Sequence, residues 1–140
     1  LAATESQNNY RISMTAGGTD GRFLWRVQDS SVNPAGVFID KFYGPPAFPA
    51  AVWTHVAGTY DGNMVRFYMN GVEVANHEEN GTIDAATDLE IGGWNQIGNV
   101  FYNGVIDEVR IWSMVRLPQE ICEDARGTYV AGSSVGTCTF

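Results

Sequence analysis

The feature that most constrains the fold of this chain is a two-residue turn, Asn70-Gly71, placed between two alternating segments. Before the turn, Val65, Phe67 and Met69 alternate with more polar residues, the period of a strand with one buried face. Asn-Gly tolerates the positive φ angles that a tight turn between antiparallel strands requires. The sequence therefore predicts an antiparallel hairpin with one face in a hydrophobic core.

Short alternating segments of this kind recur along the whole chain, separated by turns rich in glycine and proline. We expect strands over residues 10–14, 23–27, 36–42, 53–60, 64–69, 72–74, 89–92 and 105–112. A single helix is expected from Pro118 to Ala125, with proline at its first position and acidic residues in its first turn. Trp25 and Trp53 lie within expected strands and are predicted to be core residues. This pattern predicts an all-β, two-sheet antiparallel sandwich or barrel with one short C-terminal helix.

Composition and charge limit the classes of partner that the chain can bind. With 44% hydrophobic and 17% charged residues, the 140 residues have the composition of one globular domain, residues 1–140. The net charge of −8 repels phosphate backbones and anionic lipids, so we expect no nucleic acid and no membrane insertion. Because the chain begins with Leu1 rather than methionine, we expect a processed or excised part of something larger.

The two cysteines, Cys122 and Cys138, lie close together near the C-terminus. Free thiols are one alternative, but a disulfide fits the low lysine and high glycine content of a protein from an oxidising compartment. Such a bond would hold the tail, residues 122–140, against the body of the domain. We therefore expect a secreted or cell-surface protein.

Four segments carry a resemblance to a known family. Residues 53–62 (WTHVAGTYDG) resemble the W-x-H-V-A-x-T-Y-D-G strand of laminin-G-like concanavalin A domains. Residues 65–75, 89–93 and 104–112 are similar to the hairpin, the l-x-I-G strand and the G-x-I-D-E-V-R-I-W strand of that family, and pentraxins share the late pattern. The resemblance implies a jelly-roll fold and an extracellular module that binds a glycan or a protein.

The chain departs from the family at its start, where two opening strands of the family pattern do not occur. A jelly roll without those inner strands has unpaired edges and an open apolar face. A diverged start is one alternative. We favour the other two, a piece of a longer protein or an assembly in which another chain supplies the strands.

The acidic residues and the histidines are the candidate catalytic groups of the chain. In a strand, Asp107 and Glu108 point to opposite faces and cannot act as paired carboxylates, and Asp107 is expected to point inward and cap nearby groups. His55 has no nucleophile beside it in sequence and is expected to be structural. The sequence therefore predicts no enzymatic activity.

Calcium and sugar sites are expected at the loops of the sandwich rim. Asp20, Asp84 and Asp88 are candidate calcium ligands, because hard cations prefer carboxylate and amide oxygens, although solvated turn acids are the alternative. An aromatic platform flanked by amides could bind a glycan or a peptide. The residues of this candidate ligand site are Trp94, Asn95, Gln96, Asn99 and Tyr102.

Asn80-Gly81-Thr82 is a glycosylation sequon if the source is eukaryotic.

The sequence as a whole leaves two functions open. The first is an extracellular binding or adhesion module for carbohydrate or protein, and the second is a structural building block of an extracellular assembly. A polysaccharide-cleaving enzyme is a weaker third alternative.

Overall fold

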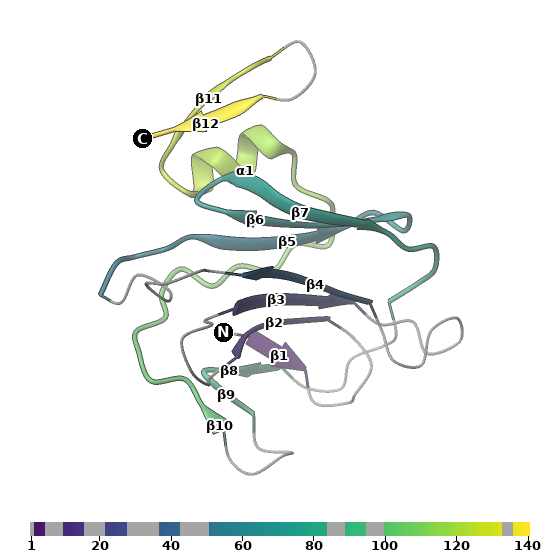
Figure 1. Cartoon of the computed structure of the whole chain (residues 1–140), viewed down its shortest axis with the longest axis vertical. Helices are drawn as coiled ribbons and strands as arrows, with labels where there is room; N and C mark the ends of the chain where they lie inside the picture. The colour runs from purple at the N-terminus through teal and green to yellow at the C-terminus, as the bar shows by residue number, and fades with distance from the viewer. Residues whose placement is uncertain are drawn as a thin grey trace.

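The computed structural model describes the backbone of residues 2–4, 10–15, 22–27, 37–42, 51–83, 89–94, 100–132 and 136–140. Two antiparallel sheets lie face to face (Figure 1). The first has the strand order β4-β3-β2-β1-β8, and the second has the order β5-β6-β7. The chain is therefore an all-β sandwich, as the alternating sequence predicts.

Four strands of the first sheet lie within residues 2–42, and the fifth, β8, comes much later in the sequence. They are β1 (Ala2–Thr4), β2 (Tyr10–Thr15), β3 (Arg22–Val27), β4 (Val37–Phe42) and β8 (Leu89–Ile91). β1 pairs with both β2 and β8, so the sheet joins segments more than eighty residues apart. The second sheet is one continuous meander of β5 (Val56–Tyr60), β6 (Met64–Met69) and β7 (Val72–Glu78).

The hydrophobic core lies between these two sheets. Trp25 and Val27 of β3 pack with Val65, Phe67 and Met69 of β6, the three residues that the alternation places on one face. Val65 and Phe67 are fully buried. Trp25 is confirmed as a core residue, whereas the prediction for Trp53 is wrong. Its side chain is 68% exposed and precedes the start of β5.

The β6–β7 hairpin has the turn that the sequence predicts. Asn70 and Gly71 both have positive φ, 45° and 68°, which is the backbone of the tight hairpin turn. The Asn70 amide donates to the His55 carbonyl (2.8 Å), and the Asn70 side-chain oxygen accepts from the His55 amide (3.0 Å). The turn therefore also fixes the start of β5.

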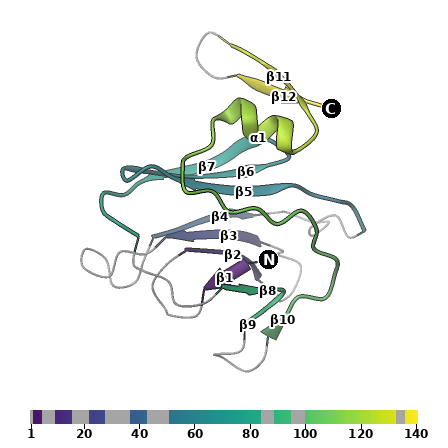
Figure 2. The same cartoon turned by 180° about the vertical axis from the view of Figure 1, so that it is seen from behind.

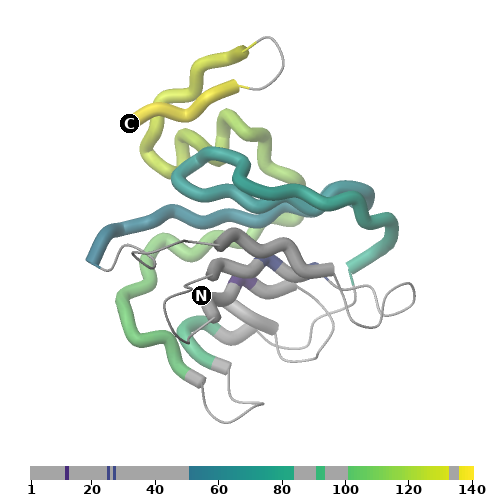
Figure 3. The backbone as a smooth tube through the Cα atoms, viewed as in Figure 1, coloured from purple at the N-terminus to yellow at the C-terminus, as the bar shows by residue number. Residues whose placement is uncertain are grey.

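The C-terminal residues form a separate layer over the outer side of the three-stranded sheet (Figure 3). Helix α1 (Pro118–Asp124) matches the predicted helix within one residue and buries Ile121 and Cys122. The antiparallel strands β11 (Thr128–Val130) and β12 (Thr137–Thr139) follow it. A disulfide joins Cys122 of α1 to Cys138 of β12, with the Cα atoms 5.6 Å apart.

Residues 105–112, which the sequence predicts to be a strand, do not form one. Glu108 has a positive φ of 53°, which interrupts an extended ladder. Asp107 does not point inward: it is exposed, and its carboxylate accepts a hydrogen bond from the Glu108 amide (2.8 Å). The physical reason is that alternation alone cannot form a strand, because its backbone groups need a neighbouring strand.

Candidate functional site

The predicted ligand site at the rim is only partly within the described residues. Trp94 lies in the two-residue strand β9 (Gly93–Trp94), where it pairs with Val100 of β10 (Val100–Phe101). Two residues further on, the Tyr102 amide donates to the Gly92 carbonyl (2.8 Å), and its half-buried ring covers Gly104. The β9–β10 pair thus brings the backbones of Trp94 and Tyr102 to the same hairpin.

The remaining rim candidates lie outside the described residues. They are the amides Asn95, Gln96 and Asn99 and the possible calcium ligands Asp20, Asp84 and Asp88. Among the residues that the structure does describe, no group of three or more histidine, cysteine or acidic residues could hold a metal ion. The calcium and glycan sites therefore stay predictions.

The sequon asparagine is accessible. Asn80 is exposed and follows β7. The residues on either side of it both bind the Tyr60 hydroxyl through their backbone carbonyls. Tyr60 donates to the carbonyl oxygens of Glu79 (3.2 Å) and Gly81 (2.8 Å). The Asn80 side chain therefore lies exposed on a surface turn that the Tyr60 hydroxyl anchors.

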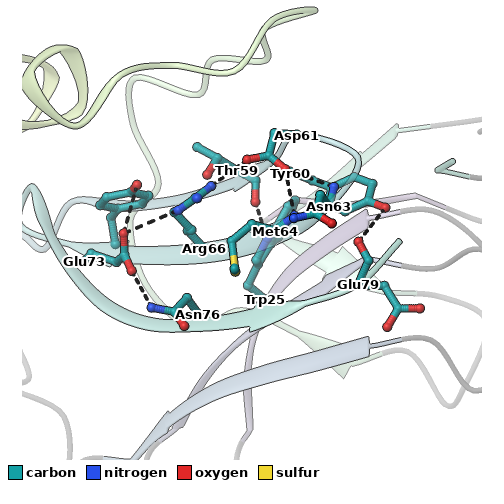
Figure 4. A network of polar contacts seen from close by, with 11 residues as sticks. Trp25, Thr59, Tyr60, Asp61, Asn63, Met64, Arg66, Glu73, Asn76 and Glu79 are labelled. Atoms are coloured by element: carbon teal, nitrogen blue, oxygen red, sulfur yellow. Dashed lines mark hydrogen bonds and ion pairs between the residues drawn. The ribbon is translucent and has the colours of Figure 1, made fainter. Parts of the chain in front are cut away.

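A polar cluster covers part of the outer face of the three-stranded sheet (Figure 4). Arg66 of β6 contacts the Asp61 carboxylate at 2.8 Å and the Glu73 carboxylate at 3.7 Å. Glu73 also accepts from the Asn76 amide (2.7 Å) and from the Tyr68 hydroxyl (3.4 Å). These residues belong to β6, β7 and the turn before β6, so the cluster ties the meander together.

The electrostatics of this cluster are those of a structural network. The hydrogen bond from Arg66 lowers the pKa of Asp61, and the bond from the Met64 amide lowers it further. Burial, reinforced by the charge of Glu73, raises the pKa of Tyr68 to about 12. The carboxylate is thus held charged and the phenol neutral at ordinary pH. Neither is suited to exchange a proton during a reaction near neutral pH.

His55 is the only described histidine that packs against the body of the domain, since His77 is exposed. Burial lowers its pKa below 6.5, the nearby Asp124 raises it and Arg110 lowers it. Its Nδ1 is buried without a hydrogen-bond partner. The imidazole is therefore held neutral as a packing residue.

A second surface, which the sequence did not predict, follows the segment that fails to form a strand. Seven apolar side chains between residues 105 and 117 have exposed fractions between 42% and 72%. We call them the apolar strip. The strip consists of Val105, Val109, Ile111, Trp112, Met114, Val115 and Leu117.

The apolar strip is held in place by two arginines bonded to α1. Arg110 binds Glu108 (2.7 Å) and Asp124 (2.8 Å). Arg116 binds Glu120 (2.8 Å) and Asp124 (3.1 Å), and its guanidinium lies 4.3 Å from the centre of the Trp112 ring. Figure 2 shows the segment crossing the back of the molecule, level with β5, before it enters the helix. The strip is therefore a fixed surface rather than a free tail.

Seven side chains at about half exposure together present on the order of 600 Å² of apolar surface along one segment, an area comparable with the largest patch of a typical monomer. Such a patch is typical of a protein-interaction surface. This surface was not predicted, because residues 105–112 were expected to form a strand with Asp107 pointing inward. The available signal was the expected lack of the family's two opening strands, which predicted an open apolar face.

The described residues define a class of protein: a disulfide-bonded all-β sandwich whose helix and tail are attached outside the second sheet. The chain belongs to the Laminin_G_3 family of the concanavalin A-like lectin/glucanases superfamily, whose family model matches residues 1–122. The predicted resemblance is thereby confirmed. The disulfide and the family are consistent with an extracellular location. None of the described helices is long and apolar enough to cross a membrane.

Two curated relatives share part of the chain. It is 35% identical over 78 residues to pappalysin-1 of Mus musculus and 33% identical over 78 residues to pappalysin-1 of Homo sapiens. Each match covers 51% of this chain but only 5% of the relative. A solved S-layer domain-containing protein of Clostridium thermocellum is 25% identical with a TM-score of 0.48, covering 89% of this chain and 61% of that one.

Proposed function

We propose that the chain is a non-catalytic extracellular binding module that recognises another protein through the apolar strip. The observation that carries the proposal is the exposure of seven apolar side chains on one anchored segment. Apolar surface of this size favours association with a partner, because removing it from water stabilises a complex. The Cys122–Cys138 disulfide supports placement outside the cell, where such bonds persist.

Catalysis finds no support among the described residues. Beside the strip, Glu108, Glu120 and Asp124 are bonded to Arg110 or Arg116. In the polar cluster, Asp61 and Glu73 contact Arg66. Glycoside hydrolysis needs two carboxyl groups facing each other across a substrate, one of them protonated. The carboxylates here serve instead as partners of arginines.

Carbohydrate binding is a second candidate, favoured by one observation. The β9–β10 pair places the backbones of Trp94 and Tyr102 on one hairpin at the rim. Aromatic rings at such a position can stack on sugar faces. Under this alternative the chain is still an extracellular binding module, but its ligand is a glycan and its binding surface is the rim.

The test compares proteins and glycans as ligands of the same sample. The tagged chain is applied to an array of purified secreted and cell-surface proteins, and to a glycan array with calcium and again with chelator. We expect saturable binding to one or more proteins, lost in Ile111→Asp and Met114→Asp. Val130→Asp is the matched control, because Val130 is 53% exposed on β11, outside the strip.

Selective glycan binding that is lost in Trp94→Ala, and unchanged in Ile111→Asp, would overturn the protein-binding proposal in favour of the rim site. Dependence on calcium would then locate a cation at the rim. Protein binding that is equal in all three aspartate variants would also contradict the proposal, because the strip would not be the binding surface.

A further inference from the structure

The segment that carries most of the apolar strip, residues 105–116, has little backbone support. None of its backbone groups is hydrogen-bonded to the backbone of another described residue. Figure 2 shows it crossing the back of the molecule outside any strand. A chain segment without a backbone ladder keeps one course only where its side chains bind it, because ordering each residue costs conformational entropy. The side-chain bonds of this segment therefore decide whether the strip is ordered.

Those bonds converge on one carboxylate, that of Asp124 at the end of α1. Its Oδ1 accepts a hydrogen bond from Arg110 (2.8 Å), and its Oδ2 accepts one from Arg116 (3.1 Å). Hydrogen bonds between two charged groups are stronger than those between neutral groups. The Arg116 guanidinium also lies 4.3 Å from the centre of the Trp112 ring, a residue of the strip. One carboxylate therefore holds the segment at its middle and at its end.

The other carboxylates that bind these arginines do not attach the segment in the same way. Glu108 binds Arg110 (2.7 Å), but it belongs to the segment itself. Glu120 of α1 binds Arg116 (2.8 Å) alone. Among the described residues, removing the charge of Asp124 would leave Arg110 with no ion pair to α1 and Arg116 with one.

Asp124 is itself held in a fixed place. Ile121 and Cys122, just before it in α1, are buried, and the disulfide joins Cys122 to the tail. Asp124 is the last residue of the helix, where the partial negative charge of the helix end disfavours a carboxylate. Its side chain is 21% exposed and that of Arg116 is 20% exposed, so water screens this pair less than a surface pair. The two arginines, rather than the helix, therefore explain an acidic residue at this position.

We infer that Asp124 is a positioning residue for the proposed binding surface, because it bonds Arg110 and Arg116 at once and so fixes the apolar strip. The inference deepens the proposed function and rests on it. An ordered surface binds more tightly than a mobile one, since a mobile surface loses conformational freedom in the complex. Asp124 acts on the partner through the two arginines and the Trp112 ring, not by touching the partner itself.

The first measurement needs no partner. Backbone order parameters are measured by NMR for the intact chain, for Asp124→Asn and for Glu123→Gln. Glu123 is the matched control, because it precedes Asp124 in α1, is exposed, and accepts a hydrogen bond from Gln119 of the same helix (2.8 Å). We expect the order parameters of residues 109–114 to fall from about 0.8 to below about 0.6 in Asp124→Asn and to stay unchanged in the control.

The second measurement is the affinity of a defined probe for the strip. The probe is a single-domain antibody selected on the intact chain and kept because Ile111→Asp abolishes its binding. We expect Asp124→Asn to weaken its binding by about tenfold or more, and Glu123→Gln to leave it unchanged. A merely structural role would lower the Tm of the variant without changing the affinity of the folded chain.

A double-mutant cycle tests the same bond from its other side and keeps the inference testable if Asp124→Asn does not fold. Arg110→Gln alone should loosen the strip and weaken antibody binding. In the Asp124→Asn background it should cost little further affinity, because the bond between the two residues is already lost. Fully additive losses would overturn the inference, since the two side chains would then act independently.

Two further outcomes would overturn the inference. Unchanged order parameters in Asp124→Asn would show that other contacts hold the strip. A loosened strip with unchanged antibody affinity would show that its position does not matter for binding. A protein array on which the parent chain binds nothing, together with a loosened strip and weakened antibody binding in Asp124→Asn, would remove the proposed function and support the positioning role.

Discussion

Reduction of the Cys122–Cys138 bond is expected to lower the free energy of unfolding by about 3 kcal/mol. The cysteines are 16 residues apart, and closing a loop of that length removes this much conformational freedom from the unfolded chain. The bond also lies at a crowded point of the folded chain. A Cβ atom added at Gly71 would be 2.5 Å from the Cys138 sulfur and 2.8 Å from the Cys122 Cα. The disulfide therefore packs directly against the β6–β7 turn.

For a domain of this size, a loss of about 3 kcal/mol corresponds to a fall of roughly 10 °C in Tm. The assay is urea denaturation followed by tryptophan fluorescence, with and without reductant, after mass analysis has shown that the isolated chain lacks free thiols. The double variant Cys122→Ala, Cys138→Ala should be insensitive to reductant. A change below about 1 kcal/mol on full reduction would refute the reasoning, because the bond would not then restrict the unfolded chain.

Phe67→Ala should lower the free energy of unfolding by about 3–5 kcal/mol in urea, because Phe67 is fully buried; a loss below 1 kcal/mol would place it outside the core. Gly58→Ala should cost about 1–3 kcal/mol and change the tryptophan emission, since the added Cβ would overlap the Trp25 ring. Burial lowers the pKa of His55 below 6.5, so its contribution to stability is complete above pH 6.5 and is lost as the pH falls through the folded value. Denaturation at several pH values should show this fall in the parent and in His77→Gln, but not in His55→Gln; equal slopes in all three would contradict it.

Local signals in the sequence predicted local structure well. The Asn70-Gly71 turn and β6 lie where the alternation places them, because a tight turn and the two faces of a strand are encoded by neighbouring residues. The helix also begins at Pro118, where a residue without an amide hydrogen is tolerated. β7 is longer than the predicted 72–74, since pairing with β6 extends it to Glu78.

Elements that depend on distant partners were not predictable in the same way. The three-residue strands β11 and β12 have no hydrophobic alternation, and they lie together where the Cys138 bond holds the tail to α1. β1 pairs with β8, a contact that no local pattern indicates. The sequence identified both cysteines as a candidate pair but could not say which surfaces their bond would join.

The wrong prediction for residues 105–112 has a physical explanation. Alternation in a sequence specifies the two faces of a strand, whereas the backbone groups that make it a strand point sideways, toward neighbours that the pattern does not name. Residues 105–112 have the alternating pattern but pair with no strand in the described part of the chain, where Val109 and Ile111 are exposed and Glu108 has a positive φ. Among the described strands, β5 pairs with β6 alone.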